Sequence, residues 1–168
     1  VLTNTVDGEG YGATDPIVNT ILDSYLGLED FSWTDKFYQS YLETINEGDK
    51  VSKAVWETVK AGNNDLINFR DYLGVYEDPW FGKVEVFLNN DQLWFKSYRS
   101  PKLNGPMGHY KANTFAIKWE YQDMNGDALA LFFLDEEGKA QRIKMKGISP
   151  NIDFSFDFQD LDLGRIDD

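Results

Sequence analysis

Cysteine is absent from the 168 residues, and histidine occurs once, as His109. Without cysteine the chain has neither a disulfide framework nor a thiolate metal site, and thiols cannot indicate its redox compartment. No apolar stretch approaches the roughly 18 residues that a membrane-spanning helix needs, and no basic segment followed by an apolar run indicates a signal peptide. We therefore expect the chain to be soluble.

Positive charge is scarce in this sequence. Sixteen basic residues stand against 29 acidic residues, which gives a formal net charge of −13. Such a charge repels the phosphates of nucleic acid and the anionic surface of a membrane, so neither is expected as a partner. The hydrophobic content of 42% and the aromatic content of 15% predict one domain with a sizeable core and a helical appendage.

The residue patterns of common hydrolase sites are also missing. None of the eight serines is followed three residues later by lysine, and no Gly-x-Ser-x-Gly elbow occurs. His109 lies between Gly108 and Tyr110 with no evident serine partner in the sequence. The sequence therefore indicates a chain that is not itself an enzyme, and no cofactor is implied.

Two acidic patterns have simple structural interpretations. Asp153 and Asp157 fall on the outward side of an expected strand, where solvent exposure explains them better than catalysis by a carboxylate pair. Residues 123–127 place three oxygen-bearing side chains at alternate positions. Their glycine comes early, however, and the later bidentate glutamate of a calcium loop is missing. An Asn-Gly hairpin turn is favoured, and no metal site is predicted.

The first predicted helix covers residues 16–26. Asp15 can cap it, Pro16 suits its first turn, and Gly27 can end it. Apolar residues recur at helical spacing and form one stripe, which must pack against something. The stripe consists of Ile17, Val18, Ile21, Leu22, Tyr25 and Leu26.

A second helix is expected from Ser32, whose hydroxyl can cap it, to about Ala61. Gly48 favours a bend within it. Its apolar side is strongly aromatic and consists of Trp33, Phe37, Tyr41, Leu42, Ile45, Val51, Val55, Trp56 and Val59. Residues 62–65 then read as a linker, after which the hydrophobic period changes from helical to alternating.

From Tyr72 onward, turn signals recur at regular intervals between short alternating segments. Eight strands are predicted, at 72–77, 83–88, 92–98, 107–111, 114–121, 127–134, 139–146 and 152–158. Short turns favour antiparallel neighbours, and eight such strands most naturally close into a barrel. The expected fold is mainly β with N-terminal α-helices (α+β), an eight-stranded antiparallel lipocalin-like barrel preceded by two helices. Strand 127–134 is apolar on both faces, so the aromatic helix is expected to cover its outer side.

Three residues near turns or barrel ends are candidates for a ligand site. They are Trp80, Arg99 and His109, and an aromatic ring, a cation and an imidazole at a barrel mouth would suit an organic anion. The simpler interpretation is that Trp80 plugs the barrel and His109 satisfies a buried hydrogen bond, and this interpretation is favoured.

Several segments together resemble a known family. They are residues 72–82 (YLGVYEDPWFG), 105–109 (GPMGH), 114–115 (TF), 149–150 (SP) and 153–158 (DFSFDF). The chain resembles the C-terminal domain of beta-lactamase-related serine hydrolases. In that family a class C-like, penicillin-binding-protein-like catalytic domain is followed by a helix and a lipocalin-like domain of undefined role. The family's catalytic motifs, Ser-x-x-Lys, Tyr-x-Asn and Lys-Thr-Gly or His-x-Gly, match no position here.

The resemblance implies a domain organisation and a location. Residues 1–31 would be the terminal strand and helix of the upstream catalytic domain, residues 32–71 a linker helix region, and residues 72–168 the lipocalin-like barrel. Residues 1–4 look like the end of a strand of that catalytic domain, so the chain is expected to be part of a longer polypeptide. The same resemblance implies that the protein would be periplasmic or secreted.

Two functions are consistent with the sequence. The first is a non-catalytic accessory domain that stabilises or modulates an upstream beta-lactamase-like domain of the same chain. The second is a lipocalin-like module whose barrel holds a small apolar or anionic molecule. A filled barrel would favour the first, and an open cavity with Trp80, Arg99 or His109 at its rim would favour the second. In isolation, the apolar stripe of helix 16–26 is expected to drive self-association.

Overall fold

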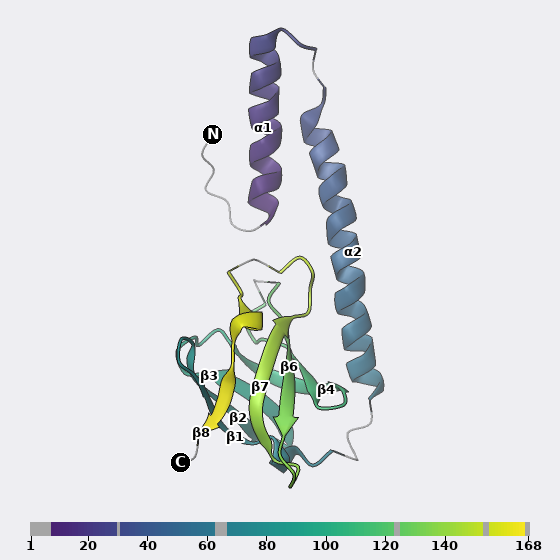
Figure 1. The fold of residues 1–168 in the computed structure, drawn as a ribbon. Helices are drawn as coiled ribbons and strands as arrows, with labels where there is room; N and C mark the ends of the chain where they lie inside the picture. Colours follow the sequence, from purple (N-terminus) through teal and green to yellow (C-terminus); the bar gives the residue numbers. More distant parts are fainter. Residues whose placement is uncertain (1–7, 30, 63–66, 123–124, 153–154, 167–168) are drawn as a thin grey trace. The chain divides into compact units, whose positions relative to one another are not determined.

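The structure is a computed structural model that describes residues 8–29, 31–62, 67–122, 125–152 and 155–166. The chain forms two compact units, one ending at Lys50 and the other beginning at Val51. A pair of helices makes up the first unit, and a β-barrel dominates the second (Figure 1). Each unit has its own packing.

Helix α1 spans Gly8–Leu26 and begins earlier than predicted. The prediction that Asp15 caps the helix and Pro16 starts it was wrong, because Pro16 lies inside the helix. A proline there has no N–H to donate to the carbonyl of Gly12 one turn earlier, so this helical hydrogen bond is missing. The predicted end is confirmed: Gly27 has φ +68°, and the Leu28 amide donates to the Asp23 carbonyl at 2.9 Å.

Helix α2 spans Trp33–Ala61 and runs through Gly48 without interruption, as predicted. Its first turn is tied to α1, because the Trp33 indole N–H donates to an Asp23 carboxylate oxygen at 2.7 Å. The rings of Phe31 and Phe37 lie 4.8 and 6.1 Å from that of Trp33. The partly buried hydrogen bond of Trp33 thus links the two helices, and the three aromatic rings pack together at the start of α2.

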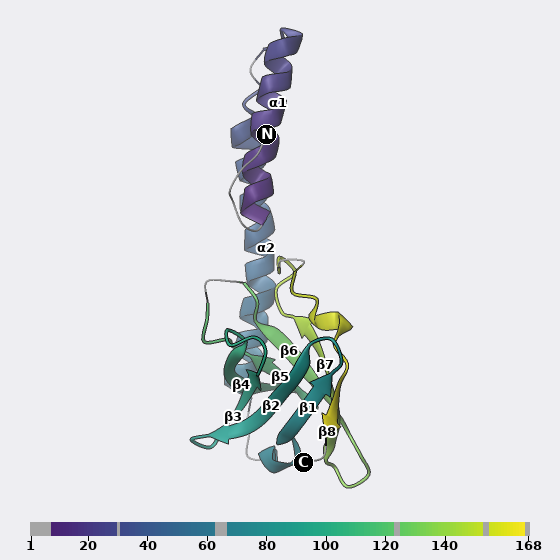
Figure 2. The same ribbon diagram turned by 90° about the vertical axis from the view of Figure 1, so that its left-hand side faces the viewer.

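The eight strands form one closed antiparallel barrel, which confirms the predicted α+β lipocalin-like fold. Figure 2 shows the strands wrapped into a barrel. Their bounds are β1 Gly74–Asp78, β2 Gly82–Asn89, β3 Gln92–Ser97, β4 Asn104–Lys111, β5 Thr114–Ile117, β6 Ala128–Leu134, β7 Ala140–Gly147 and β8 Leu163–Ile166. Each strand pairs with the next along the chain, and β8 pairs back with β1, so no sheet edge is left open.

The predicted position of the eighth strand was wrong. Residues 152–158 were expected to form it, but β8 is Leu163–Ile166, and Phe158–Asp160 is the 3-10 helix η2. Residues 153 and 154 lie outside the described residues. Phe158 is buried because it packs on Trp119, with ring centroids 6.1 Å apart, and not because it alternates along a strand. Aromatic residues of a segment without strand structure thus have the same spacing as the inward-facing residues of a strand.

Large side chains fill the inside of the barrel. Tyr76, Phe95, Phe115 and Phe132 are each at most 1% exposed. Tyr76 and Phe115 each meet Phe132 edge to face, at 6.2 and 5.6 Å, and Phe95 meets Trp119 in the same way at 5.6 Å. This arrangement suits the ring quadrupoles and leaves little free volume along the barrel axis.

The second half of α2 covers part of the barrel's outer surface. Val55 forms a buried cluster with Ala116 of β5 and Leu129 of β6. A side chain at Gly108 of β4 would place its Cβ 2.4 Å from a methyl group of Val59, so glycine allows this close approach. The predicted helical cover of strand 127–134 is confirmed at Leu129.

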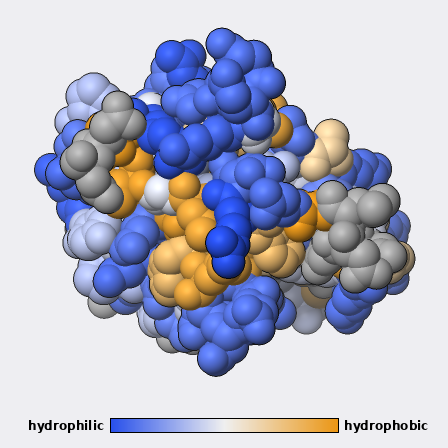
Figure 3. Space-filling view, turned by 90° about the horizontal axis from the view of Figure 1, so that it is seen from below, coloured by the Kyte–Doolittle hydropathy of each residue, from blue (hydrophilic) through white to orange (hydrophobic). Residues whose placement is uncertain are grey.

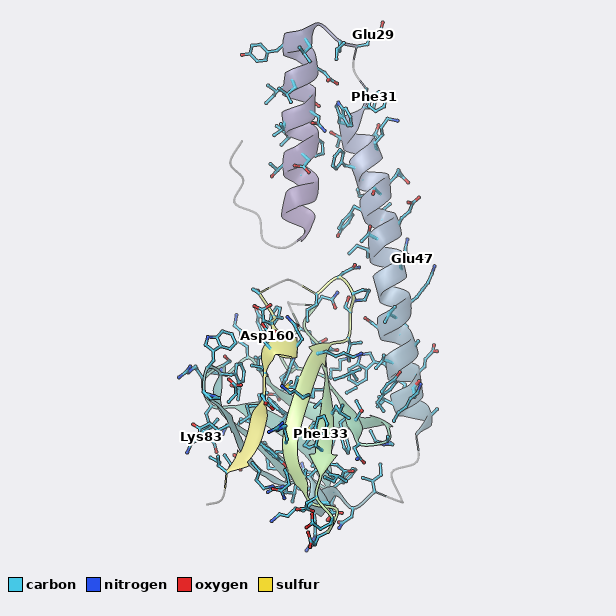
Figure 4. The ribbon with its side chains drawn as sticks, in the orientation of Figure 1. Glu29, Phe31, Glu47, Lys83, Phe133 and Asp160 are labelled. Atoms are coloured by element: carbon cyan, nitrogen blue, oxygen red, sulfur yellow. The ribbon has the colours of Figure 1, made fainter. Side chains whose placement is uncertain are left out.

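The cover ends there, however, because Leu131 and Phe133 on the outer face of β6 are 41% and 47% exposed. The labelled Phe133 marks this strand in Figure 4.

The end of the barrel where β6 and β7 join is closed by Arg165. Its guanidinium group donates to the Leu73 carbonyl and the Tyr76 hydroxyl, both at 2.9 Å, and to the Ala140 carbonyl. Burial raises the pKa of Tyr76 to about 12, although the nearby Arg165 charge and hydrogen bond lower it. Figure 3 views the barrel from below, and hydrophobic residues gather in the middle of this face.

A candidate ligand cleft at one end of the barrel

The opposite end of the barrel carries a cleft of about 330 Å³. Three segments surround it: the turn between β1 and β2, the loop between β3 and β4, and the segment that leads into β8. In Figure 4 the labelled Asp160 marks η2 at this end. The described residues that line the cleft are Trp80, Phe81, Arg99, Ser100, Leu103, Ser155, Phe156, Asp157, Phe158 and Leu161.

Asp78 holds two of these segments together. One carboxylate oxygen accepts the backbone amides of Trp80 and Phe81 at 2.8 and 2.9 Å, and the other accepts the Asp162 amide at 3.0 Å. The first two hydrogen bonds close the local turn that Asp-Pro sequences favour, whereas the bond to Asp162 joins residues 84 positions apart. Asp78 therefore positions both the tryptophan and the start of β8.

The protonation of Asp78 reflects these bonds. Burial by itself would raise the pKa of its carboxyl group. The amides of Asp162, Phe81 and Trp80, with the charge of Lys144, outweigh that effect and hold the pKa below its ordinary value of 3.8. The carboxylate is thus ionised at neutral pH and binds its three donors as an anion.

Arg99 lies at the rim of the cleft. Its Nη1 donates to the Trp80 carbonyl at 2.6 Å. A Cβ placed on Gly82 would lie 3.7 to 4.0 Å from its Nε, Cζ and Nη2, so the guanidinium group presents its face to Gly82. The loop that carries Arg99 is itself closed, because the Ser97 amide donates to the Leu103 carbonyl at 3.0 Å.

The floor of the cleft is apolar. Leu103, Phe158 and Leu161 are buried at 7%, 3% and 1% exposure. Phe156 lies against Phe158 with ring centroids 5.6 Å apart. The cleft thus combines an apolar floor with aromatic side chains and one arginine at the rim, and Asp157 adds a carboxylate. Such a surface can hold an apolar body and one polar group.

A protein-family model matches residues 58–165, from the last turn of α2 to β8, and describes a domain of unknown function (DUF3471). The chain belongs to the DUF3471 family. No curated protein and no solved structure shows significant similarity to the chain. The cleft and the barrel both lie within the DUF3471 domain, whereas α1 lies before it.

Of the three predicted ligand residues, the DUF3471 barrel brings two together. Trp80 and Arg99 are hydrogen-bonded at the cleft, and Trp80 is 67% exposed, so it does not plug the barrel. His109 lies near the far end of β4, and β4 runs away from the cleft for about 17 Å before it reaches His109. One ring nitrogen of His109 is 2.7 Å from the Ala112 carbonyl, and the ring meets Phe115 edge to face.

The predictions from sequence did not include most of the cleft. Asp78, Phe81, Leu103 and Leu161 were not singled out, although the Asp-Pro-Trp-Phe-Gly turn contained a signal for the first two. Leu161 could not be found, because it belongs to a segment that was assigned no structure. Phe156 and Phe158 fell within the predicted strand 152–158, but they reach the end of the barrel from outside a strand.

The acidic segments of the DUF3471 domain have structural partners. Asp127 accepts the Trp119 amide at 3.3 Å, and Asn125 donates to the Ser149 hydroxyl at 2.9 Å. Asp123 and Asp153 lie outside the described residues. Within the described part of the chain, no group of three or more His, Cys, Asp or Glu side chains is placed to hold a metal ion.

The helical unit before the DUF3471 domain has a hollow of its own, also of about 330 Å³. It is lined by Gly12, Ala13, Thr34, Phe37, Tyr38 and Tyr41. The apolar stripe of α1 is largely exposed as well. Among the residues that the structure describes, none of the helices has the length and apolar character to span a bilayer.

Proposed function

We propose that this chain is a non-catalytic accessory module of a beta-lactamase-related serine hydrolase. Helix α1 docks on the hydrolase domain of the same polypeptide, and the DUF3471 barrel stabilises that domain or shapes access to its active site. The resemblance described above supports the nature of the partner. The structure supports the idea that a partner is needed.

The exposed stripe on α1 carries the proposal. Ile21, Leu22 and Leu26 are 45%, 52% and 71% exposed within the described chain. Burial of one such side chain stabilises a protein by about 1.5–3 kcal/mol. A row of them on one face of a helix is typical of a helix that packs on another surface.

The filled barrel supports a structural role over a carrier role. Tyr76 and Phe132 meet edge to face at 6.2 Å inside the barrel, and Tyr72 and Phe132 at 5.1 Å. A ligand held inside would have to displace these rings. The second candidate function, a ligand carried within the barrel, has less support for this reason.

The test compares the full-length polypeptide with and without residues 72–168. We expect the shortened protein to unfold at a temperature lower by roughly 4 °C or more. We also expect a changed kcat/KM for nitrocefin or for an ester. Unchanged stability and unchanged kinetics would contradict the proposal.

Docking by α1 is tested in the same full-length protein by Ile21→Glu, with Asn19→Glu as the control. Both substitutions add one negative charge to α1, but only the first interrupts the apolar stripe. We expect a loss of thermal stability for Ile21→Glu alone. Equal effects of the two substitutions would exclude docking through this face.

A further inference from the structure

The cleft of the DUF3471 domain offers a positive group that its own protein contacts leave partly unused. Among the described residues, Arg99 has one hydrogen-bond partner, the Trp80 carbonyl, which accepts from its Nη1. The Nε–H and one Nη2–H of an arginine point the same way and form the edge that matches a carboxylate with two parallel hydrogen bonds. That edge has no acceptor among the described residues.

The Arg99 side chain is exposed, and its hydrogen bond to the Trp80 carbonyl orients the guanidinium group before any ligand arrives. The bond is short, at 2.6 Å, and Gly82, whose φ is +86°, lies opposite one face of the group. The closed loop from Ser97 to Leu103 limits the movement of the backbone at Arg99. Fixing a binding group in advance reduces the entropy lost when a ligand is bound.

The rest of the cleft favours a ligand that is apolar beyond its charged group. Its floor is the buried set Leu103, Phe158 and Leu161, and Trp80 offers a large exposed ring. A volume of about 330 Å³ is at the lower end of small-molecule sites. A compound with one ring or a short aliphatic chain fits this space better than a peptide.

We propose that the cleft binds small monocarboxylates with an aromatic or aliphatic body. Arg99 grips the carboxylate through its Nε and Nη2, and the apolar body lies on the floor beside Trp80. The site is independent of docking by α1, so it goes beyond the accessory role proposed above.

The net charge of −13 does not exclude an anionic ligand. At physiological ionic strength charges are screened over about 8 Å, so the charged groups near the cleft dominate the electrostatic potential there. Among the residues that line it, Arg99 and Asp157 are the charged ones. Asp157 accepts a hydrogen bond from Gln159 at 3.2 Å. The ionised Asp78 carboxylate, which accepts the Trp80 and Phe81 amides, lies close by as well. The local charge therefore does not attract an anion by itself, and the carboxylate contact depends on the geometry of Arg99.

The test is a nuclear magnetic resonance titration of the 168-residue chain with 3-phenylpropionate and with its neutral amide, 3-phenylpropionamide. The indole N–H signal of Trp80 and the Nε–H signal of Arg99 are followed, after assignment with Trp80→Phe and Arg99→Lys. We expect saturable shifts of both signals with the acid, and at least tenfold weaker binding of the amide.

Arg99→Gln should remove this preference, so that acid and amide bind within about twofold of each other. Lys139→Gln is the matched control, since it also removes one positive charge, from the turn between β6 and β7 at the other end of the barrel. It should leave the preference unchanged. Unfolding curves of both variants verify that the barrel is intact.

Three results would overturn the proposal. One is equal binding of acid and amide by the unchanged chain, and another is an acid preference that survives Arg99→Gln. The third is an absence of saturable shifts at Trp80 and Arg99, including the case where only signals of the helical unit move. Failure here would leave the docking role of α1 untouched, because that role is measured on the full-length protein.

Discussion

Asp78 shows how one side chain determines the form of the cleft. It is 6% exposed and joins the turn after β1 to the segment before β8 through three backbone amides. The same bonds place Trp80 beside Arg99. At the scale of single residues, the candidate site depends on a carboxylate that does not itself line the cleft.

Replacement of Asp78 by alanine should therefore destabilise the barrel. Three amides would lose a charged acceptor, and we expect a loss of about 3 kcal/mol in the free energy of unfolding. Urea denaturation measures this value, with Glu77→Ala as the control at an exposed neighbouring position. A loss no greater than that of the control would contradict the assigned role.

The pH dependence of this effect has a defined sign. The folded-state pKa of Asp78 is held below its ordinary value of 3.8. Its contribution is therefore complete above the unfolded-state pKa and is lost as the pH falls through the folded-state pKa. As the pH falls from above 3.8 to below the folded-state pKa, the unchanged chain should lose more stability in urea denaturation than Asp78→Ala does.

At the scale of elements, α2 and the barrel depend on a few close approaches. Gly108 of β4 lies against Val59 of α2, and Val55 is buried with Leu129 of β6. Because the family match begins at residue 58, the last turn of α2 belongs with the barrel in sequence as well as in packing. This part of α2 is best regarded as a component of the DUF3471 domain.

Gly108→Ala tests this contact. Its Cβ would lie 2.4 Å from a Val59 methyl group, and such overpacking costs about 1–3 kcal/mol. Val59→Ala removes the obstructing methyl groups, so the double variant should lose less stability than the sum of the two single variants. Additive losses in chemical denaturation would show that the two residues do not interact.

At the scale of the whole molecule, two units differ in how completely they are packed. The barrel buries its inner side chains almost fully, whereas α1 leaves its stripe exposed, with Tyr25 at 89%. Within the described chain, the stripe is the apolar surface that folding by itself buries least. A second copy of the chain is one surface that can cover it.

The isolated chain should therefore self-associate through α1. Size-exclusion chromatography with light scattering should give a mass that rises above 19.3 kDa as the concentration increases. Ile21→Glu should return the chain to a monomer, and Asn19→Glu should not. A dilute monomer whose α1 amides are fully protected from hydrogen exchange would contradict this prediction.

Much of the fold could be predicted because local patterns and packing agreed. Seven strands were predicted close to their observed positions. Turn residues such as Asn-Asn-Asp, Asn-Gly and Glu-Gly separate segments in which apolar and polar residues alternate. Gly27 ended α1 as expected because its positive φ suits glycine. The start of α1 was misplaced because Asp15 and Pro16 form a strong local signal that the helix overrides.

The candidate site was less predictable. Trp80 and Arg99 were identified as residues at turns, but nothing local could show that they share a cleft and that His109 does not. Phe156 and Phe158 alternate like strand residues, yet β8 is the short and more polar Leu-Gly-Arg-Ile. Its strand structure comes from pairing with β1 and β7, and such pairing has no signal within four residues.

The sequence by itself determined the class of the fold, because hydrophobic alternation and turn residues act over a few neighbouring positions. It also determined the acidic character that disfavours nucleic acid as a partner. Tertiary structure alone decided where the barrel closes, how Arg165 seals one end, and which side chains meet around the cleft at the other. These contacts join residues as far apart as Asp78 and Asp162, and their energies depend on the whole barrel being formed.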